Sequence, residues 1–354
     1  MQSFVPTLGE RRMNQIFTDR QSITRSITQL RPDWFVLSLI ATVAAASLLP
    51  CHGTTAGVFS TLGMFAIGSL FFLQGARLSR AAVIAGITHW RLHLGIAVCT
   101  FTLFPLLGSA LIALFPHAMG RELWLGLLFV CALPSTVQSS IALVSIAQGN
   151  VAGAVCAATG SNLLGFVLTP LLLAVTTHLH GGSVDVTGIW KVMLDLLAPF
   201  IAGHLLRPWI GPWVERNRPV LTITDRSSIL LVVYTAFSAG VIHGIWHQLP
   251  PVMLATLTLA AAMLLAMVLV TAVLGSRAFG FDRGDEIAIV LCGSQKSLVT
   301  GVPMANALFP AAIVGQVMLP LMIYYLMQLL VGAWLARRYA THSTVADYPV
   351  TARS

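Results

Sequence analysis

Ten apolar stretches, each long enough to cross a bilayer, constrain the fold of this chain more than any other feature. A hydrocarbon core of about 30 Å requires roughly 20 apolar residues of helix. The chain is 56% hydrophobic and only 9% charged, whereas soluble domains carry about 25% charged residues. The pattern predicts an all-α membrane protein whose ten transmembrane helices lie at 33–50, 55–76, 92–115, 123–147, 151–175, 189–207, 228–246, 252–276, 285–307 and 312–336.

The basic residues predict how these spans are oriented. Positive residues collect in cytoplasmic loops, and an N-terminus placed inside leaves only Arg121 and Lys191 outside, with Lys296 in the membrane. The net charge of +8 is spread over short gaps and forms no basic face for nucleic acid. We expect a multi-pass protein of the cell membrane with a cytoplasmic N-terminal segment at 1–32 and a cytoplasmic tail at 337–354. The cytoplasmic basic residues are Arg11, Arg12, Arg20, Arg25, Arg31, Arg77, Arg80, Arg91, Arg207, Arg216, Arg218, Arg226, Arg277, Arg283, Arg337, Arg338 and Arg353.

The spans divide into two related sets of five. Because five is odd, a repeated five-helix unit inserts upside down the second time, which predicts inverted repeats at 33–175 and 189–336. Spans 4 and 9 then correspond, and they carry similar segments, VQSS at 137–140 and SQKS at 294–297. Pro134 removes a helix hydrogen bond in one span, and Gly293 weakens the helix interior in the other. Interrupted spans at matching places indicate a transport site.

Lys296 lies in the middle of the ninth span, far from either membrane surface. An ammonium in hydrocarbon costs about 2.5–3.5 kcal/mol on insertion scales, so a lysine there marks a candidate functional site. The alternative is that Pro134 and Gly293 are ordinary kinks and that the polar residues only join packed helices. Two breaks and one buried lysine at equivalent positions favour the functional interpretation.

The two interrupted segments resemble those of the bile acid:sodium symporter family (solute carrier 10-like). Residues 134–140 (PSTVQSS), followed by 148–152 (QGNVA), resemble the family's Pro-Gly-Gly-Thr-Ala-Ser-Asn and Arg-Gly-Asn-Val-Ala. Residues 293–297 (GSQKS) resemble its Gly-Met-Gln-Asn-Ser. The likeness covers about residues 33–336, and it is greatest to the family's branch of proposed symporters, which includes a vertebrate orphan member.

The resemblance implies both a fold and a set of site residues. In that family, ten spans form two inverted repeats with crossed, broken helices 4 and 9. Spans 3, 4, 5, 8, 9 and 10 form a core domain, spans 1, 2, 6 and 7 form a panel domain, and the substrate binds between them. The cation site or substrate cavity implied for this chain comprises Thr100, Gln138, Ser139, Ser140, Thr159, Ser294, Gln295, Lys296 and Ser297.

Individual positions carry the family's ligands with some departures. Ser139 and Ser140 match a Ser-Asn pair at one sodium site, and Gln295 matches a glutamine ligand of the second. Thr100 matches a glutamine ligand on span 3, and Thr159 lies near a threonine ligand. In place of the acidic ligand stands Leu291, and in place of one asparagine stands Lys296. Sodium as the coupling ion is therefore in doubt.

We predict that the Lys296 ammonium takes the place of one sodium ion. It donates three hydrogen bonds, and we expect it to meet the oxygens of Thr100, Gln138, Ser139 and Ser140 and the exposed carbonyls of the broken helices. An ammonium that loses and regains its proton would couple transport to protons. One that stays charged would leave transport uncoupled.

The predicted function is secondary active transport of a small organic solute by alternating access. The half-helix N-termini of spans 4 and 9 and the charge of Lys296 indicate an anion. The alternatives are a sodium-coupled organic-anion symporter and a non-transporting membrane regulator on the same fold. We predict no enzyme, because the chain lacks His-Glu-X-X-His and Gly-X-Ser-X-Gly motifs, and no resident metal or cofactor, because the five cysteines lack metal-ligand spacing. Asp195, inside the sixth span, is either a proton or cation site or a residue facing water.

Overall fold

The computed structural model describes residues 34–77, 89–179 and 186–346, and these residues form helices and no strand. The predicted N-terminal segment at 1–32 and the end of the predicted tail, 347–354, lie outside them. The all-α prediction is confirmed for the described residues. The helices are α2 (Trp34–Leu48), α3 (Gly53–Arg77), α5 (Trp90–Val98), the π-helical turn η1 (Cys99–Leu103), α6 (Phe104–Leu114), α7 (Arg121–Ala132), α8 (Gln138–Ile146), α9 (Val151–Leu179), α10 (Val186–Arg216), α11 (Arg218–Ile242), α12 (Ile245–Gln248), α13 (Pro251–Ala278), α14 (Arg283–Gly293), α15 (Leu298–Leu308) and α16 (Ala311–Ala346).

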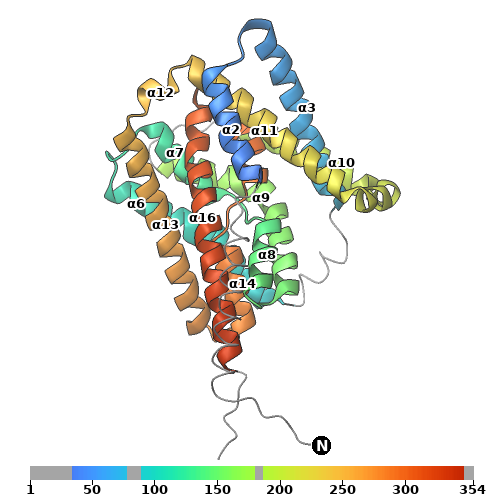
Figure 1. The fold of residues 1–354 in the computed structure, drawn as a ribbon, viewed down its shortest axis with the longest axis vertical. Coiled ribbons are helices and arrows are strands. Elements are labelled where there is room, and N and C mark those ends of the chain that lie inside the picture. Colours follow the sequence, from blue (N-terminus) through green and yellow to red (C-terminus); the bar gives the residue numbers. More distant parts are fainter. Residues whose placement is uncertain (1–33, 78–88, 180–185, 347–354) are drawn as a thin grey trace, which may run out of the picture.

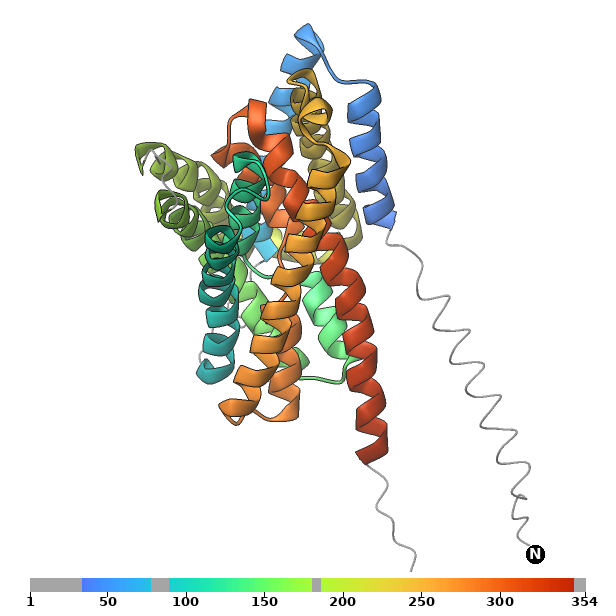
Figure 2. The same cartoon turned by 90° about the vertical axis from the view of Figure 1, so that its left-hand side faces the viewer.

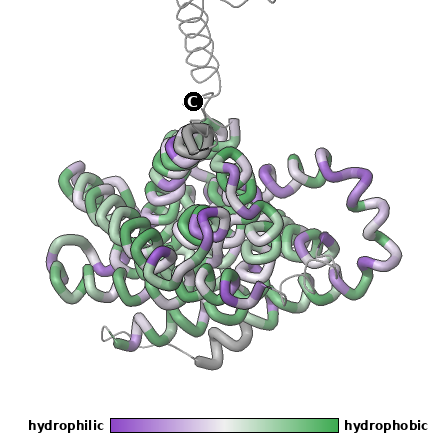
Figure 3. The backbone as a smooth tube through the Cα atoms, turned by 90° about the horizontal axis from the view of Figure 1, so that it is seen from below, coloured by the Kyte–Doolittle hydropathy of each residue, from purple (hydrophilic) through white to green (hydrophobic). Residues whose placement is uncertain are grey.

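Seven helical segments in the described part of the chain are long and apolar enough to cross a membrane, and α2 is a shorter apolar helix. They are Gly53–Arg77, Trp90–Leu114, Val151–Leu179, Arg218–Ile242, Pro251–Ala278, Arg283–Leu308 and Ala311–Thr341. Apart from Arg283–Leu308, which is almost entirely buried, these segments carry exposed large hydrophobic side chains on their outer faces. Figure 3 shows hydrophobic residues along the outer helices of the bundle. The chain is thus a multi-pass membrane protein.

The helices extend further than the apolar runs do. The predicted spans end at 207 and resume at 228, but α10 continues to Arg216 and α11 begins at Arg218, with only Asn217 between them. Likewise, α16 continues to Ala346, ten residues past the predicted end of the last span. Hydropathy reports where a helix leaves the hydrocarbon, whereas backbone hydrogen bonding carries the helix on into a polar region.

The helices pack as two groups, which Figures 1 and 2 show from two sides. In the first group α3 packs against α10, and α11 packs against α2 and α3. The α3–α10 crossing is close, because a Cβ at Gly75 or Gly203 would collide with the backbone of the opposite helix. The second group consists of α5–α9 and α13–α16, which pack against one another. The groups meet where α11 contacts α15 and α16, and where α10 contacts α9.

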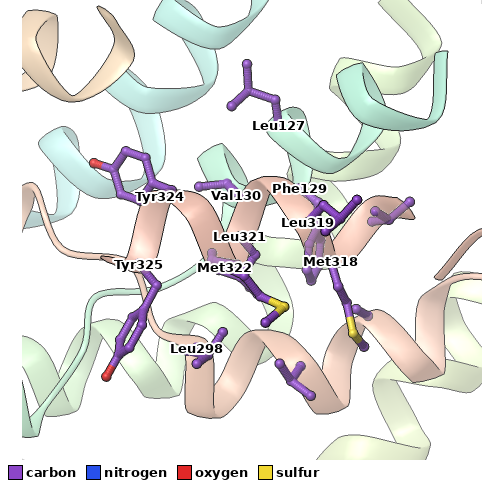
Figure 4. Packing of buried hydrophobic residues seen from close by; sticks show 14 of the residues in the cluster. Leu127, Phe129, Val130, Leu298, Met318, Leu319, Leu321, Met322, Tyr324 and Tyr325 are labelled. Carbon is purple, nitrogen blue, oxygen red and sulfur yellow. The ribbon is translucent and has the colours of Figure 1, made fainter. Parts of the chain in front are cut away.

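The interior of the second group is built around α16. Figure 4 shows side chains of α16 between those of α7 and the start of α15. Among them Leu321 and Tyr324 are fully buried, as are Leu127 and Leu298 on the neighbouring helices. Between membrane-spanning helices such side chains are held by van der Waals packing rather than by removal of apolar surface from water. α16 is thus packed against the end of one helix, α7, and the start of another, α15.

Candidate functional site

Two helices are interrupted at corresponding places. After α7 ends at Ala132, the chain is non-helical over 133–137 until α8 begins at Gln138. After α14 ends at Gly293, the chain is non-helical over 294–297 until α15 begins at Leu298. Both interruptions lie where the sequence places its helix breakers. Gln138 is the first residue of α8 and Gly293 is the last residue of α14, so neither lies in the non-helical segment itself.

The two interruptions contact each other directly. The backbone N–H of Ser297 donates to the carbonyl of Pro134 at 2.9 Å. The Ser135 hydroxyl donates to the carbonyl of Cys292 at 2.6 Å. On the opposite side Gly165 of α9 makes room for the proline ring, since a Cβ there would lie 2.7 Å from Pro134. Polar backbone groups freed by one break are thus satisfied by the other, as buried backbone requires.

The side chain of Lys296 crosses from the second interruption to the first. It is fully buried. Its Nζ donates to the carbonyl oxygens of Thr100 at 2.8 Å, Cys131 at 2.9 Å and Leu133 at 2.7 Å. We call these three oxygens the carbonyl site. An ammonium has three donors, so the carbonyl site satisfies all of them.

Two different local structures free these carbonyls. Cys131 and Leu133 stand at the end of α7, where no following turn supplies N–H donors. Thr100 lies in the π-helical turn, where the N–H of Phe104 bonds to Cys99 rather than to Thr100. The next candidate donor would come from Pro105, which has no N–H. Both the break and the proline therefore leave acceptors that point at Lys296.

The positive charge is balanced by dipoles rather than by a carboxylate. None of the ion pairs in the described part of the chain includes Lys296. The C-terminal end of a helix carries a partial negative charge, and Cys131 and Leu133 lie at that end of α7. The Lys296 Nζ lies 4.0 Å from the centroid of the Phe104 ring, which adds a cation–π contact. The carbonyl site is a cation site by its chemistry.

The predicted side-chain oxygens of the first interruption do not bind Lys296. The Ser140 hydroxyl lies 3.0 Å from that of Thr136 and 3.4 Å from that of Ser135, and Ser139 also contacts Thr136. Gln138 is exposed at the start of α8. This part of the prediction is wrong, because three backbone carbonyls accept all three hydrogen bonds of the ammonium.

Two more predicted oxygens lie elsewhere. Thr159 donates to the carbonyl of Val155 in its own helix at 2.7 Å, so its hydroxyl serves α9. The Thr100 hydroxyl is buried without a partner, and this residue reaches Lys296 only through its carbonyl. Asp195 is exposed on α10.

The residues next to Lys296 are held in place from α15 and α16. Ser297 caps α15 by accepting the N–H of Thr300 at 3.2 Å. The Ser294 carbonyl accepts the Tyr324 hydroxyl at 2.9 Å. The Gln295 amide nitrogen donates to the Gln328 carbonyl at 3.3 Å, and its amide oxygen is buried without a partner.

Sequence reasoning missed Gln328 and Tyr324. The Gln328 amide oxygen accepts the backbone N–H of Lys296 at 2.7 Å, and its amide nitrogen donates to the Lys296 carbonyl at 2.9 Å. Two polar residues four positions apart share one helix face, and polar residues in a span join helices. That pattern within 312–336 could have identified the pair.

Asn150, from the QGNVA segment, was also missed as a contact between helices. Its amide nitrogen donates to Asp285 at 2.7 Å, and its backbone N–H donates to Gly284 at 3.0 Å. Its amide oxygen accepts the N–H of Gly153 at 2.8 Å. Asn150 thus joins the beginnings of α9 and α14, and Asp282 caps α14 through the N–H of Asp285.

Comparison with known proteins places this architecture among transporters. The model of the SBF-like CPA transporter family matches residues 33–341. A protein of Pseudomonas aeruginosa is 56% identical over 310 residues, which are 87% of this chain and 93% of the relative. YfeH of Escherichia coli (strain K12), named as a proposed symporter, is 50% identical over 307 residues, 87% of this chain and 92% of the relative. Sodium/bile acid cotransporter 7 of Rattus norvegicus is 29% identical over 317 residues, 87% of this chain and 93% of the relative.

Proposed function

We propose, from the premise that this chain belongs to the SBF-like CPA transporter family, that it moves a small organic anion across the membrane with Lys296 in place of a sodium ion. Membership confirms the predicted relation to the bile acid:sodium symporters, and this is a family of transporters rather than of enzymes. The single observation that carries the proposal is the carbonyl site, occupied by the protein's own ammonium.

The carbonyl site supports the replacement of sodium on chemical grounds. Backbone carbonyls of unwound helices are the groups that coordinate Na⁺ in transporters built this way. Here three of them converge on one fixed cation from two segments of the chain. A sodium ion in the same place would compete with a charge that cannot leave. We therefore expect wild-type protein to transport without sodium.

A charge attached to the chain can still couple transport to protons. Burial disfavours the ammonium relative to the neutral amine, and its three hydrogen bonds favour the ammonium. If the carbonyl site opens in one conformation and closes in another, the balance between the two forms changes during the cycle. Such a change would carry one proton per turnover, whereas a lysine charged throughout would leave transport uncoupled.

The first interruption supports an anionic solute. The start of α8 has no side-chain cap, and its first residue, Gln138, is exposed with Ser139 half-buried beside it. Free N–H groups and the helix dipole attract negative charge at such an end. The Lys296 ammonium contributes only its field, because its donors are all occupied and it is buried. Contact with the solute therefore falls to the side chains around α8.

The arrangement proposed for transport has ten spans in two inverted repeats. The group of α2, α3, α10 and α11 corresponds to a panel, and the remaining helices to a core that carries both interruptions. Both termini would be cytoplasmic. In a variant without the five native cysteines, a single cysteine placed at Ala118, between α6 and α7, should then react with a membrane-impermeant maleimide added outside intact cells. Reaction only after lysis would contradict this topology.

Ligand binding followed by uptake tests the proposed function. Purified protein is screened by thermal shift against taurocholate and a set of mono- and dicarboxylates, in sodium and in choline buffers. We expect stabilisation by at least one anion to the same extent in both buffers. Uptake of that anion into proteoliposomes should then follow an imposed pH gradient and ignore a sodium gradient. Binding without uptake would favour the non-transporting regulator, and uptake driven by sodium would favour a sodium-coupled symporter.

A further inference from the structure

The Gln328 amide bonds to the backbone N–H and the backbone C=O of a single residue, Lys296, and so contacts the peptide groups on both sides of its Cα. Its oxygen accepts the Lys296 N–H at 2.7 Å, and its nitrogen donates to the Lys296 carbonyl at 2.9 Å. Gln328 is itself fully buried. We infer that Gln328 is a positioning residue that directs the Lys296 ammonium into the carbonyl site. This inference rests on the proposed role of Lys296.

The geometry explains why one residue can control a charge at the far end of another side chain. Lys296 lies in a non-helical segment, so no helix of its own fixes its backbone. The orientation of the backbone on both sides of its Cα sets the direction in which the side chain leaves. Gln328 bonds to both the N–H and the C=O of Lys296, as the backbone of a neighbouring strand would. Its own helix, α16, is held by packing against α7 and α15. The backbone of Lys296 thus acquires a fixed orientation without helical hydrogen bonds.

The helix α16 also reaches the other end of the lysine side chain. Tyr324, one turn before Gln328, donates to the Ser294 carbonyl at 2.9 Å. Its ring meets that of Phe104 edge-on, with centroids 5.9 Å apart, and Phe104 lies beside the ammonium. One face of α16 therefore supports both the root of the side chain and the aromatic ring next to its charge.

A positioning role has a consequence that simple space filling lacks. Without Gln328, the peptide groups on either side of Lys296 can rotate and the ammonium can leave the carbonyl site. The three carbonyls then become available to a mobile cation while the lysine is still present. Gln328→Met should therefore give the protein some of the sodium response expected when Lys296 itself is removed.

The position of the ammonium can be measured without a transport assay. Wild type, Gln328→Met, Gln328→Glu and Tyr324→Phe are treated with formaldehyde and cyanoborohydride, and dimethylation of Lys296 is read by peptide mass spectrometry. We expect at least tenfold faster modification for Gln328→Met. Tyr324→Phe, which removes a hydrogen bond of the same segment but leaves the Lys296 peptide paired, should stay within threefold of wild type.

Rescue by a conservative change separates positioning from size. A neutral carboxylic acid keeps both an acceptor and a donor, and burial favours that neutral form. In Gln328→Glu, Lys296 should therefore be dimethylated at a rate within threefold of wild type. Methionine is similar in size to glutamate but has no such donor and acceptor, so size alone does not explain the difference from Gln328→Met. If Gln328→Met does not fold, Gln328→Asn replaces it, because its shorter side chain reaches only one of the two peptide groups.

The sodium response provides the second readout. We expect NaCl, relative to choline chloride, to raise the thermal midpoint of Gln328→Met but not of Tyr324→Phe or wild type. The inference is overturned if Lys296 in Gln328→Met is dimethylated at a rate within threefold of wild type. It is also overturned if Lys296 is dimethylated as fast in Tyr324→Phe as in Gln328→Met. Fast modification of Gln328→Met with no sodium response in either Gln328→Met or Lys296→Asn would support the positioning role and contradict the replacement of sodium.

Discussion

The two interrupted helices correspond in sequence but differ in what they expose. In the first, α7 ends at Ala132, two residues before Pro134, and α8 begins with an uncapped turn whose first residue, Gln138, is exposed. Between α14 and α15 all four non-helical residues are buried, and Ser297 caps the following helix. The peptide groups of the second break are also held by α16.

This difference indicates a division of roles between two related segments. The second break carries the Lys296 ammonium and its four non-helical residues are buried, so it suits a cation that stays attached to the chain. The first break supplies carbonyls to that charge from the end of α7 and leaves the start of α8 accessible, so it suits a solute that comes and goes. In the inverted repeat that we propose, the two copies would keep a similar break and differ in role.

The largest expected effect contrasts Lys296→Met with Gln138→Met. Removing the ammonium leaves three buried carbonyls without donors, and each unsatisfied buried polar group costs about 1–3 kcal/mol. Lys296→Met should lower the free energy of unfolding by about 3 kcal/mol or more in sodium-free buffer. Gln138→Met, at an exposed position, should change it by less than about 0.5 kcal/mol. Denaturant unfolding in detergent measures both, and equal losses would remove the proposed contrast.

A smaller effect is expected at the two helix starts. Ser297→Ala removes the oxygen that caps α15, and loss of such a cap costs about 1 kcal/mol. The corresponding residue before α8 is Val137, which provides no side-chain cap, so Val137→Ala should cost clearly less. Thermal unfolding of the two variants side by side gives the comparison. A greater loss for Val137→Ala would mean that the first helix start is the more constrained one.

The smallest expected effect concerns the solute. Gln138→Ala should leave the thermal midpoint of the free protein unchanged, because the side chain is exposed. One lost hydrogen bond of about 1 kcal/mol corresponds to roughly fivefold weaker binding. Titration of the stabilising anion, followed by thermal shift, measures this change. Unaltered affinity in Gln138→Ala, together with weaker binding in a variant of the first helix group such as Asp195→Asn, would move the solute away from α8.

The sequence predicted the main features of the site because they arise from local chemistry. Helix breakers within apolar runs indicated both interruptions, and a lysine far from either surface indicated a buried charge. The partners of that charge were harder to predict. Thr100 was expected to meet the ammonium, and it does so through its carbonyl, because the π-helical turn directs the N–H of Phe104 to Cys99 and Pro105 has no N–H. In a regular α-helix the proline would instead free the carbonyl of Phe101, so the sequence alone does not indicate the Thr100 carbonyl.

Other parts of the site depend on packing that no local pattern determines. Gln328 lies on another helix, and its pairing with the Lys296 peptide depends on how α16 is rotated against α15. Hydropathy indicates that α16 spans the membrane and does not indicate which face meets the interruption. The same limit applies to Ser139 and Ser140. Their hydroxyls bond within their own segment, and the carbonyls at the end of α7 accept from the ammonium instead.

Direct binding of ²²Na⁺ tests most directly whether Lys296 stands in place of a sodium ion. Wild type and Lys296→Asn are purified in choline buffer, and bound ²²Na⁺ is measured by a scintillation proximity assay up to millimolar sodium. We expect no saturable binding to wild type and saturable binding to Lys296→Asn, in which the carbonyl site is open to a mobile cation. Saturable binding to wild type with the same affinity as to Lys296→Asn would show that the ammonium does not occupy a sodium site.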